Sequence, residues 1–175
     1  MKCRLLMLLL FLGSIGSLYS MNPNEMLISG AENKDREMVQ DALKQKADIN
    51  YKDKSGYTAL IWAVEKSNRW MVKLLLDAGA DPDIKNNYGF TNLMLAVVND
   101  NPPIVELLLN SGASLNLINT SGNTALDLAK KGGYKVTEKL IENEATRRKE
   151  LKEEVTKYIL PELAEIVLNY EAGSK

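Results

Sequence analysis

The sequence predicts an all-α fold in which helix–turn–helix units stack into a solenoid. The first observation is that the segment Gly56-Tyr-Thr-Ala-Leu-Ile-Trp-Ala recurs, with changes, at residues 89–96 and 122–129, a period of 33 residues. The second is that an apolar stripe follows each copy at the same period, through Leu74, Leu107 and Leu140. A turn signal followed by two apolar helical stripes is typical of stacked repeats, which bury their apolar faces against one another.

Residues 1–20 have the layout of a secretory signal peptide. Lys2 and Arg4 precede an apolar run at residues 5–12, and small residues follow that run. Cleavage after Gly16 or Ser20 would export the chain to the periplasm or the exterior. An uncleaved anchor is the alternative, although the apolar run is shorter than the ~20 residues that a spanning helix needs.

Composition supports one domain and excludes several classes of function. The chain has 175 residues, of which 45% are apolar and 26% charged, as in a single soluble domain. Loss of the signal peptide would remove Lys2 and Arg4 but no acid, so the net charge would move from −1 to −3. Without a basic cluster, no nucleic-acid partner is expected. Cys3 is the single cysteine, so the mature chain depends on stacking and not on disulfide bonds.

The first two repeats are predicted at residues 21–52 and 53–85. The first lacks the Gly-x-Thr opening, which fits an N-terminal cap whose outer face meets water, and Asp35 is its expected N-cap. The second is the most complete. We expect Thr58 to cap its first helix, Asn68 to cap its second helix, and Gly79 to end that second helix.

The next two repeats are predicted at residues 86–118 and 119–145. In the third, Asn101 is the expected N-cap, and Pro102 and Pro103 fit the first helical turn, where a missing N–H has no helical partner in any case. In the fourth, polar residues occupy two positions that are apolar elsewhere, Thr137 and Glu138. We therefore expect its second helix to shift register onto a stripe of Val136, Leu140 and Ile141.

Residues 146–175 are predicted to form two C-terminal helices that cap the open end of the solenoid. The first, over residues 145–158, would carry intrahelical ion pairs and bury a stripe of Leu151, Val155 and Tyr158. Pro161 forces a new start. An amphipathic helix is then indicated by the spacing of Leu163, Ile166, Val167 and Tyr170.

The repeated motifs resemble the ankyrin repeat. Gly-x-Thr-x-Leu-x-x-Ala and the segments at residues 74–81 and 107–114 carry the resemblance, which spans about residues 24–144. It implies about four repeats, each with two antiparallel helices and a projecting β-hairpin loop. The usual Thr-Pro-Leu-His is absent, since the chain has Thr58-Ala-Leu-Ile at this place and no histidine anywhere. We therefore expect looser hydrogen bonding between hairpins than is usual in the family.

The residue inventory argues against an enzyme. A chain without histidine has no Ser-His-Asp or Cys-His nucleophile system and no histidine zinc site. No glycine-rich phosphate loop or EF-hand spacing is present either. No cofactor and no metal are expected. The acids fall at helix exteriors, caps and loop stems, so a pair of carboxylates in one cleft is not indicated.

The resemblance implies a surface that binds a protein partner through hairpin tips and the exposed side of the first helices. Carried over position by position, this surface comprises Lys54, Ser55, Tyr57, Glu65, Lys66, Asn87, Tyr88, Phe90, Val98, Asn99, Thr120, Ser121 and Asn123. The aromatic members either anchor a partner or pack against neighbouring loops, and the sequence leaves both open. Trp62 is expected inside the inter-repeat core. The protein is expected to be monomeric, with no membrane insertion once the signal is removed.

A second class of function is indicated by the tail. The segment that starts Leu160-Pro-Glu-Leu-Ala-Glu-Ile resembles the opening of an F-box-type helix, which follows the repeats in some ankyrin proteins of viruses and intracellular bacteria. The resemblance implies a host-directed effector or adaptor that links the repeats to a ubiquitin ligase. About a dozen residues carry this resemblance.

Overall fold

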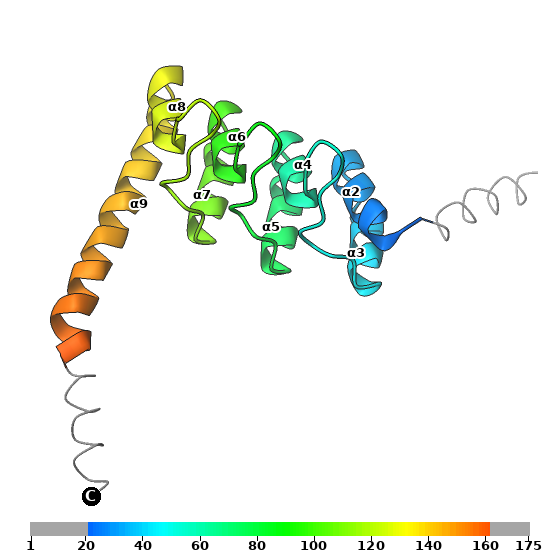
Figure 1. Ribbon diagram of the computed structural model, residues 1–175, viewed down its shortest axis with the longest axis horizontal. Coiled ribbons are helices and arrows are strands. Elements are labelled where there is room, and N and C mark those ends of the chain that lie inside the picture. The colour runs from blue at the N-terminus through cyan, green and yellow to red at the C-terminus, as the bar shows by residue number, and fades with distance from the viewer. Residues whose placement is uncertain (1–20, 162–175) are drawn as a thin grey trace, which may run out of the picture.

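The structure, a computed structural model that describes residues 21–161, is a row of four stacked helix pairs (Figure 1). The first helices of the pairs form one layer and the second helices form the other, with the loops rising beside the first helices. No strand occurs in the described part of the chain. The predicted all-α repeat solenoid is confirmed. In order, the pairs are α2 (Pro23–Asn33) with α3 (Arg36–Lys44), α4 (Ala59–Glu65) with α5 (Arg69–Asp77), α6 (Asn92–Val98) with α7 (Pro102–Asn110), and α8 (Ala125–Gly132) with α9 (Lys135–Glu154).

Side-chain caps set where the helices begin. Thr58 Oγ1 accepts a hydrogen bond from the Ile61 N–H at 3.2 Å, and Thr91 and Thr124 do the same at the starts of α6 and α8. The second helices α3, α5 and α7 are capped in the same way by Asp35, Asn68 and Asn101. Each such cap contributes about 1 kcal/mol, so the predicted helix starts are confirmed and have a common physical cause.

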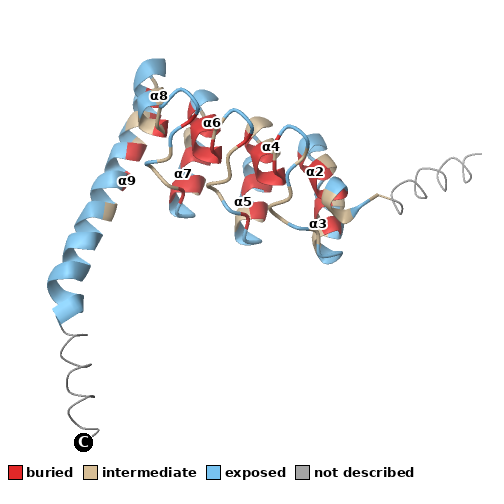
Figure 2. Ribbon diagram, in the orientation of Figure 1, coloured by how far each residue is buried: buried red, intermediate tan, exposed pale blue. Residues whose placement is uncertain are grey.

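The core runs without interruption along the row of repeats. Figure 2 shows buried residues on the facing sides of the helices, from α2 to the start of α9. Large side chains recur at one position of the first helices as Leu27, Leu60 and Leu93, and small ones at another as Gly30, Ala63, Ala96 and Ala129. A seven-residue helix such as α4 is far too short to persist alone, so these contacts between repeats hold it in place.

The fourth repeat keeps the register of the others, so the predicted shift is wrong. Thr137 is fully buried at the position that Met71 and Ile104 occupy in the preceding repeats, whereas Val136 is 63% exposed. The packing of α9 against α7 determines which face of α9 is buried. This packing outweighs the cost of burying the Thr137 hydroxyl. The Thr137 hydroxyl has no hydrogen-bond partner among the described residues.

Replacing Thr137 by valine should stabilise the protein. The substitution keeps the side-chain shape and removes a buried, unpaired hydroxyl, which costs about 1 kcal/mol or more to bury. We expect the melting temperature to rise by about 2–4 °C, measured by circular dichroism. The matched control is Thr146→Val on the same helix, because the Thr146 hydroxyl is exposed and donates to the Glu142 carbonyl. An equal gain from both changes would contradict this account.

The tail differs from the expectation of a separate helix starting at residue 145. Helix α9 continues without a break from Lys135 to Glu154 and passes into a π-helical turn, η1 (Val155–Ile159). The predicted burial of Leu151, Val155 and Tyr158 is wrong, since all three are exposed. The cause is the length of α7, which ends at Asn110 and leaves this part of α9 without a neighbour among the described residues.

Two predicted segments fall outside the described residues and stay predictions. These are the signal peptide at residues 1–20 and the second tail helix with the F-box-like segment, of which Leu160 and Pro161 alone are described. Both of these residues are exposed. Within residues 21–161 no helix is both long and apolar enough to cross a membrane.

A cluster of three charged side chains, Glu144, Arg147 and Arg148, joins α9 to the end of α7. Arg148 donates to the carbonyls of Leu109, in the last turn of α7, and Ala113, just past its end, at 3.1 and 2.9 Å. Glu144 is 8% exposed and accepts hydrogen bonds from Arg147 and Arg148 at 2.7 to 2.8 Å. The hydrogen bonds from Arg147, and then those from Arg148, lower the pKa of Glu144 to about 2, against the opposing effect of burial.

The hydrogen bonds between Glu144 and the two arginines predict that stability depends on pH. Because the folded pKa of Glu144 is depressed from 4.5 to about 2, its contribution is present above about pH 4.5 and is lost as the pH falls toward 2. At pH 7, Glu144→Gln should cost about 1–2 kcal/mol of unfolding free energy. This difference from wild type should shrink in denaturant titrations at falling pH. The control is Glu142→Gln, whose exposed pair with Lys130 contributes little. A Glu144→Gln effect independent of pH would contradict the assignment.

Candidate functional site

One side-chain oxygen holds each hairpin loop in shape. The Oδ1 atom of Asp53 accepts hydrogen bonds from the N–H groups of Ser55 and Tyr57, at 2.8 and 2.9 Å. The same pair of bonds recurs one and two repeats later, from residues 88 and 90 to Asn86 and from residues 121 and 123 to Asn119. These loops are therefore preorganised from within, by a residue that the sequence analysis did not single out.

Neighbouring loops are also joined to one another by side-chain hydrogen bonds, and the expectation that this bonding is looser than is usual in the family stays a prediction. Lys52 Nζ donates to the Lys85 carbonyl at 3.0 Å, and Lys85 Nζ donates to the Ile118 carbonyl at 2.8 Å, one repeat further on. The tips are linked as well, through bonds from Asn87 Nδ2 to the Lys54 carbonyl and from Thr120 Oγ1 to the Tyr88 carbonyl. Lysine, asparagine and threonine thus link the loops of a chain that has no histidine.

The glycine of each loop makes this close approach possible. Gly56 has φ +75°, and a Cβ atom there would lie 2.9 Å from the backbone nitrogen of Asn87 in the next loop. Gly89 stands in the same relation to the backbone nitrogen of Thr120. Gly122 has the same φ within a degree, but open space surrounds it. Gly56 and Gly89 are therefore required for two reasons, the positive φ and the close approach of the next loop. At Gly122 the positive φ is the single reason.

Alanine substitutions should separate the cost of the positive φ from the cost of the contact with the next loop. Gly122→Ala should cost about 1–2 kcal/mol, the penalty of a positive φ alone. Gly56→Ala should cost clearly more, because its Cβ also pushes the loop of Asn87 away. Chemical denaturation of the two variants checks this. Equal losses of stability would mean that the loops separate freely and would contradict the linked arrangement.

Predicted site residues of the second and third repeats come together around one open depression. Its lining comprises Ser55, Tyr57, Trp62, Glu65, Lys66 and Tyr88. The rings of Tyr57 and Trp62 lie 4.9 Å apart, Trp62 Nε1 donates to Asp53 Oδ2 at 3.0 Å, and Lys66 Nζ lies 5.2 Å from the Trp62 ring centre. Trp62 is partly exposed here, so its predicted place inside the inter-repeat core is wrong.

The structure divides the three predicted aromatic residues between the two roles that the sequence left open. Tyr57 and Phe90 are partly buried and pack against the core. Burial, and after it the nearby Glu65 carboxylate, raises the pKa of Tyr57. Tyr88 is 66% exposed, although its backbone is bound on both sides, by Asn86 and by Thr120. Tyr88 is therefore an exposed ring on a fixed loop.

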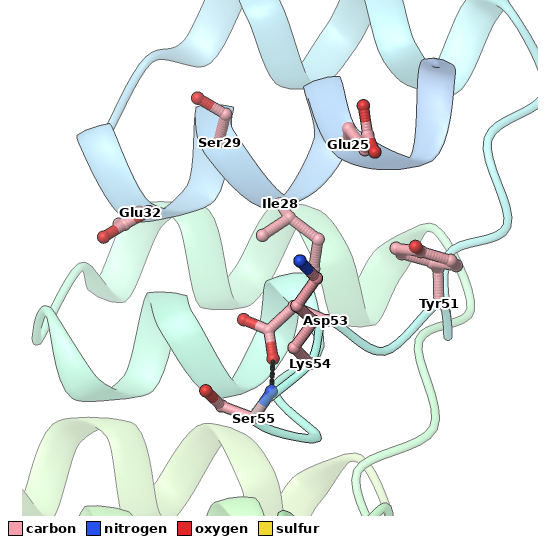
Figure 3. Close-up of a pocket in the computed structure, with 8 residues that line it drawn as sticks. All are labelled: Glu25, Ile28, Ser29, Glu32, Tyr51, Asp53, Lys54 and Ser55. Carbon is pink, nitrogen blue, oxygen red and sulfur yellow. Dashed lines mark hydrogen bonds between the residues drawn. The ribbon is translucent and has the colours of Figure 1, made fainter. Parts of the chain in front are cut away.

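A second pocket adjoins the first and was missed by the sequence analysis. Figure 3 shows it between α2, with Glu25, Ile28, Ser29 and Glu32, and the chain that enters the first loop, with Tyr51, Asp53, Lys54 and Ser55. Ser55 lines both pockets. The 33-residue period could have predicted this pocket, since Ser29 and Glu32 align with Trp62 and Glu65, which line the first one. It was overlooked because the first repeat has no Gly-x-Thr loop.

The other predicted residues lie further along the row and line neither pocket. Val98 is 44% exposed, Asn99 is the C-cap of α6, and Asn123 accepts a hydrogen bond from Lys131. None of the predicted residues is buried. The acids beside the pockets, Glu25, Glu32 and Glu65, form no ion pair within residues 21–161. In the same range no group of three potential ligands is placed to hold a metal ion.

Comparison with protein families identifies the class. The family model described as ankyrin repeats (3 copies) matches the chain over residues 4–86, 26–119 and 80–153. These matches cover most of the chain, which therefore belongs to the ankyrin repeat family. Ankyrin repeats are generally protein–protein interaction modules and are typically non-catalytic. A comparison with curated proteins found no match.

Proposed function

We propose that this chain binds a protein partner through its hairpin tips and the exposed side of its first helices, with Tyr88 as the central anchor. The observation that carries this proposal is the position of Tyr88. Its ring is 66% exposed on a loop that hydrogen bonds hold from both sides, at the rim of the depression that contains Tyr57 and Trp62.

A fixed, exposed aromatic ring favours binding for two reasons. A tyrosine side chain removes a large apolar area from water on contact and offers a hydroxyl for a hydrogen bond. Because Asn86 and Thr120 already hold the loop of Tyr88, little backbone entropy is lost when a partner docks. The surface is therefore prepared for binding without a large rearrangement.

The charges near the anchor indicate what the partner presents. Glu65 and Lys66 balance each other in the depression beside Tyr88, whereas the pocket at α2 holds Glu25, Glu32 and Asp53 against Lys54 alone, an excess of acid. Acids of this kind attract basic side chains and set the orientation of an encounter. We therefore propose a partner surface with an apolar patch opposite Tyr88 and basic residues toward α2.

A photocrosslinking amino acid at position 88 should capture this partner in cells. The matched control carries the same group at position 136, which is equally exposed but lies on α9 in the other helical layer. With the captured protein in hand, Tyr88→Ala should weaken binding by about tenfold or more, as at other aromatic anchors. The melting temperature should stay unchanged, because the ring of Tyr88 is mostly exposed.

Two outcomes would contradict the proposal. One is equal capture from positions 88 and 136, which would mean that the loops are not the binding face. The other is unchanged affinity for Tyr88→Ala. In contrast, Tyr57→Ala should lower the melting temperature, because its ring packs on Trp62 and the core.

A further inference from the structure

One position of the first helices changes its charge from repeat to repeat along the row. The residues at this position are Glu32, Glu65, Val98 and Lys131, each 33 residues after the one before. All four are at least partly exposed. Equivalent places at the two ends of the row therefore carry opposite charges.

The structure places this position beside the loops. Glu32 lines the pocket at α2 together with Ser55, and Glu65 lines the next depression together with Tyr57. Lys131 Nζ donates to Asn123 Oδ1, and Asn123 is the equivalent of Tyr57 two repeats later. These side chains thus belong to one face of the row, on which the first helices border the loop tips.

The first-repeat end of this face is acidic. The pocket at α2 holds Glu25, Glu32 and Asp53 against Lys54 alone, and Figure 3 shows both glutamates on α2, across from the chain that carries Asp53. The oxygens of Asp53 accept hydrogen bonds from its own loop and from Trp62 Nε1. The two glutamates therefore supply the acidic groups that a ligand would meet here.

The fourth-repeat end of this face is basic. Lys131 donates to the neutral amide oxygen of Asn123, and this bond brings no acid to its charge. The other charges of α8 are used elsewhere, since Lys130 pairs with Glu142 on α9 and Asp127 belongs to the capping box at the start of α8. Lys131 is therefore the charge that α8 presents beside the loops.

Between the two ends the face is apolar and aromatic. Glu65 and Lys66 balance each other in the depression that contains the ring of Tyr57. The third repeat presents Tyr88 and Val98, which are 66% and 44% exposed. The order along the face is thus acid, aromatic and apolar residues, and base.

The spacing of the repeats matches the period of one kind of extended chain. Packed helices lie about 8–10 Å apart. A polyproline II segment has three residues per turn and advances about 9 Å in each turn, so every third side chain points the same way. A β-strand alternates every second residue, so its side chains three apart point to opposite sides. Exposed aromatic rings, here Tyr57, Trp62 and Tyr88, are also what polyproline II segments bind.

We propose that the partner lays a polyproline II segment of about ten residues along this face, with basic residues at α2, apolar residues beside Tyr88 and Val98, and an acidic residue at Lys131. The inference rests on the proposed function, to which it adds the conformation of the bound segment and the direction in which it runs. The direction is set by charge, because the reverse orientation would place like charges together at both ends.

Two synthetic peptides of the same composition test the order of charges. Both have about ten residues, with proline and leucine in the middle. The ordered peptide has its lysines at one end and its glutamates at the other, and the mixed peptide has both kinds at each end. In NMR titrations of the full chain at low ionic strength, we expect the ordered peptide to bind at least about threefold more tightly. High salt should remove this difference.

Charge reversals on the protein test the direction. The variant Glu25→Lys, Glu32→Lys and the variant Lys131→Glu should each weaken the ordered peptide by about threefold and leave the mixed peptide unchanged. The triple variant should bind the ordered peptide again, turned end for end. A spin label on the lysine end should then broaden amide signals of α8, whereas in wild type it should broaden those of α2.

The matched control is Glu106→Lys, the same change on α7 in the other helical layer, which should affect neither peptide. All the substituted positions are exposed, so circular dichroism should show the stack intact in every variant.

Three results would overturn the inference: equal binding of the two peptides, no binding of either, or a spin label at the same end of wild type and the triple variant. If Tyr88→Ala still releases the partner captured at position 88, the proposed function stands without this inference. Unchanged partner affinity in Tyr88→Ala, with the ordered peptide still preferred, would count against the anchor and not against the charge order.

Discussion

The short first helices exist because each repeat covers the next. Helices α4 and α6 have seven residues each, too few to be stable in water, and their apolar faces meet neighbours at positions such as Leu60, Ala63 and Leu93. The small side chain at Ala63 and its equivalents lets the helices approach closely. The rest of the structure depends on this packing between repeats. The threonine caps determine where the first helices begin, and the packing between repeats keeps these helices folded.

Hydrogen bonds within and between the loops fix their backbone and leave side chains at the tips available for recognition. Asp53, Asn86 and Asn119 hold the loops from within, and the lysine and threonine bonds join each loop to the next. Once backbone groups are satisfied in this way, the side chain at the tip is not needed for folding. Tyr88 can therefore be a large exposed ring, although exposure of such a ring carries no benefit for stability.

The first and last repeats each pack against a neighbouring repeat on one side only, and there the chain differs from the regular repeat. The first repeat has no Gly-x-Thr motif, and a pocket lies between α2 and the loop of the next repeat. At the other end, Arg148 joins α9 to the end of α7 and to the buried carboxylate of Glu144, and three apolar side chains of α9 lie exposed beyond α7. A buried charge is tolerated there because its hydrogen bonds are complete.

The sequence by itself determined the period, the four helix pairs and the caps at Thr58, Asn68 and Asn101. These features depend on local chemistry or on spacing along one chain. Only the tertiary structure decided that Trp62 lines a depression, that Tyr57 packs while Tyr88 stands free, that Thr137 is buried, and that Leu151, Val155 and Tyr158 are exposed. Each of these depends on where a neighbouring repeat begins or ends, and a pattern within one helix does not contain that information.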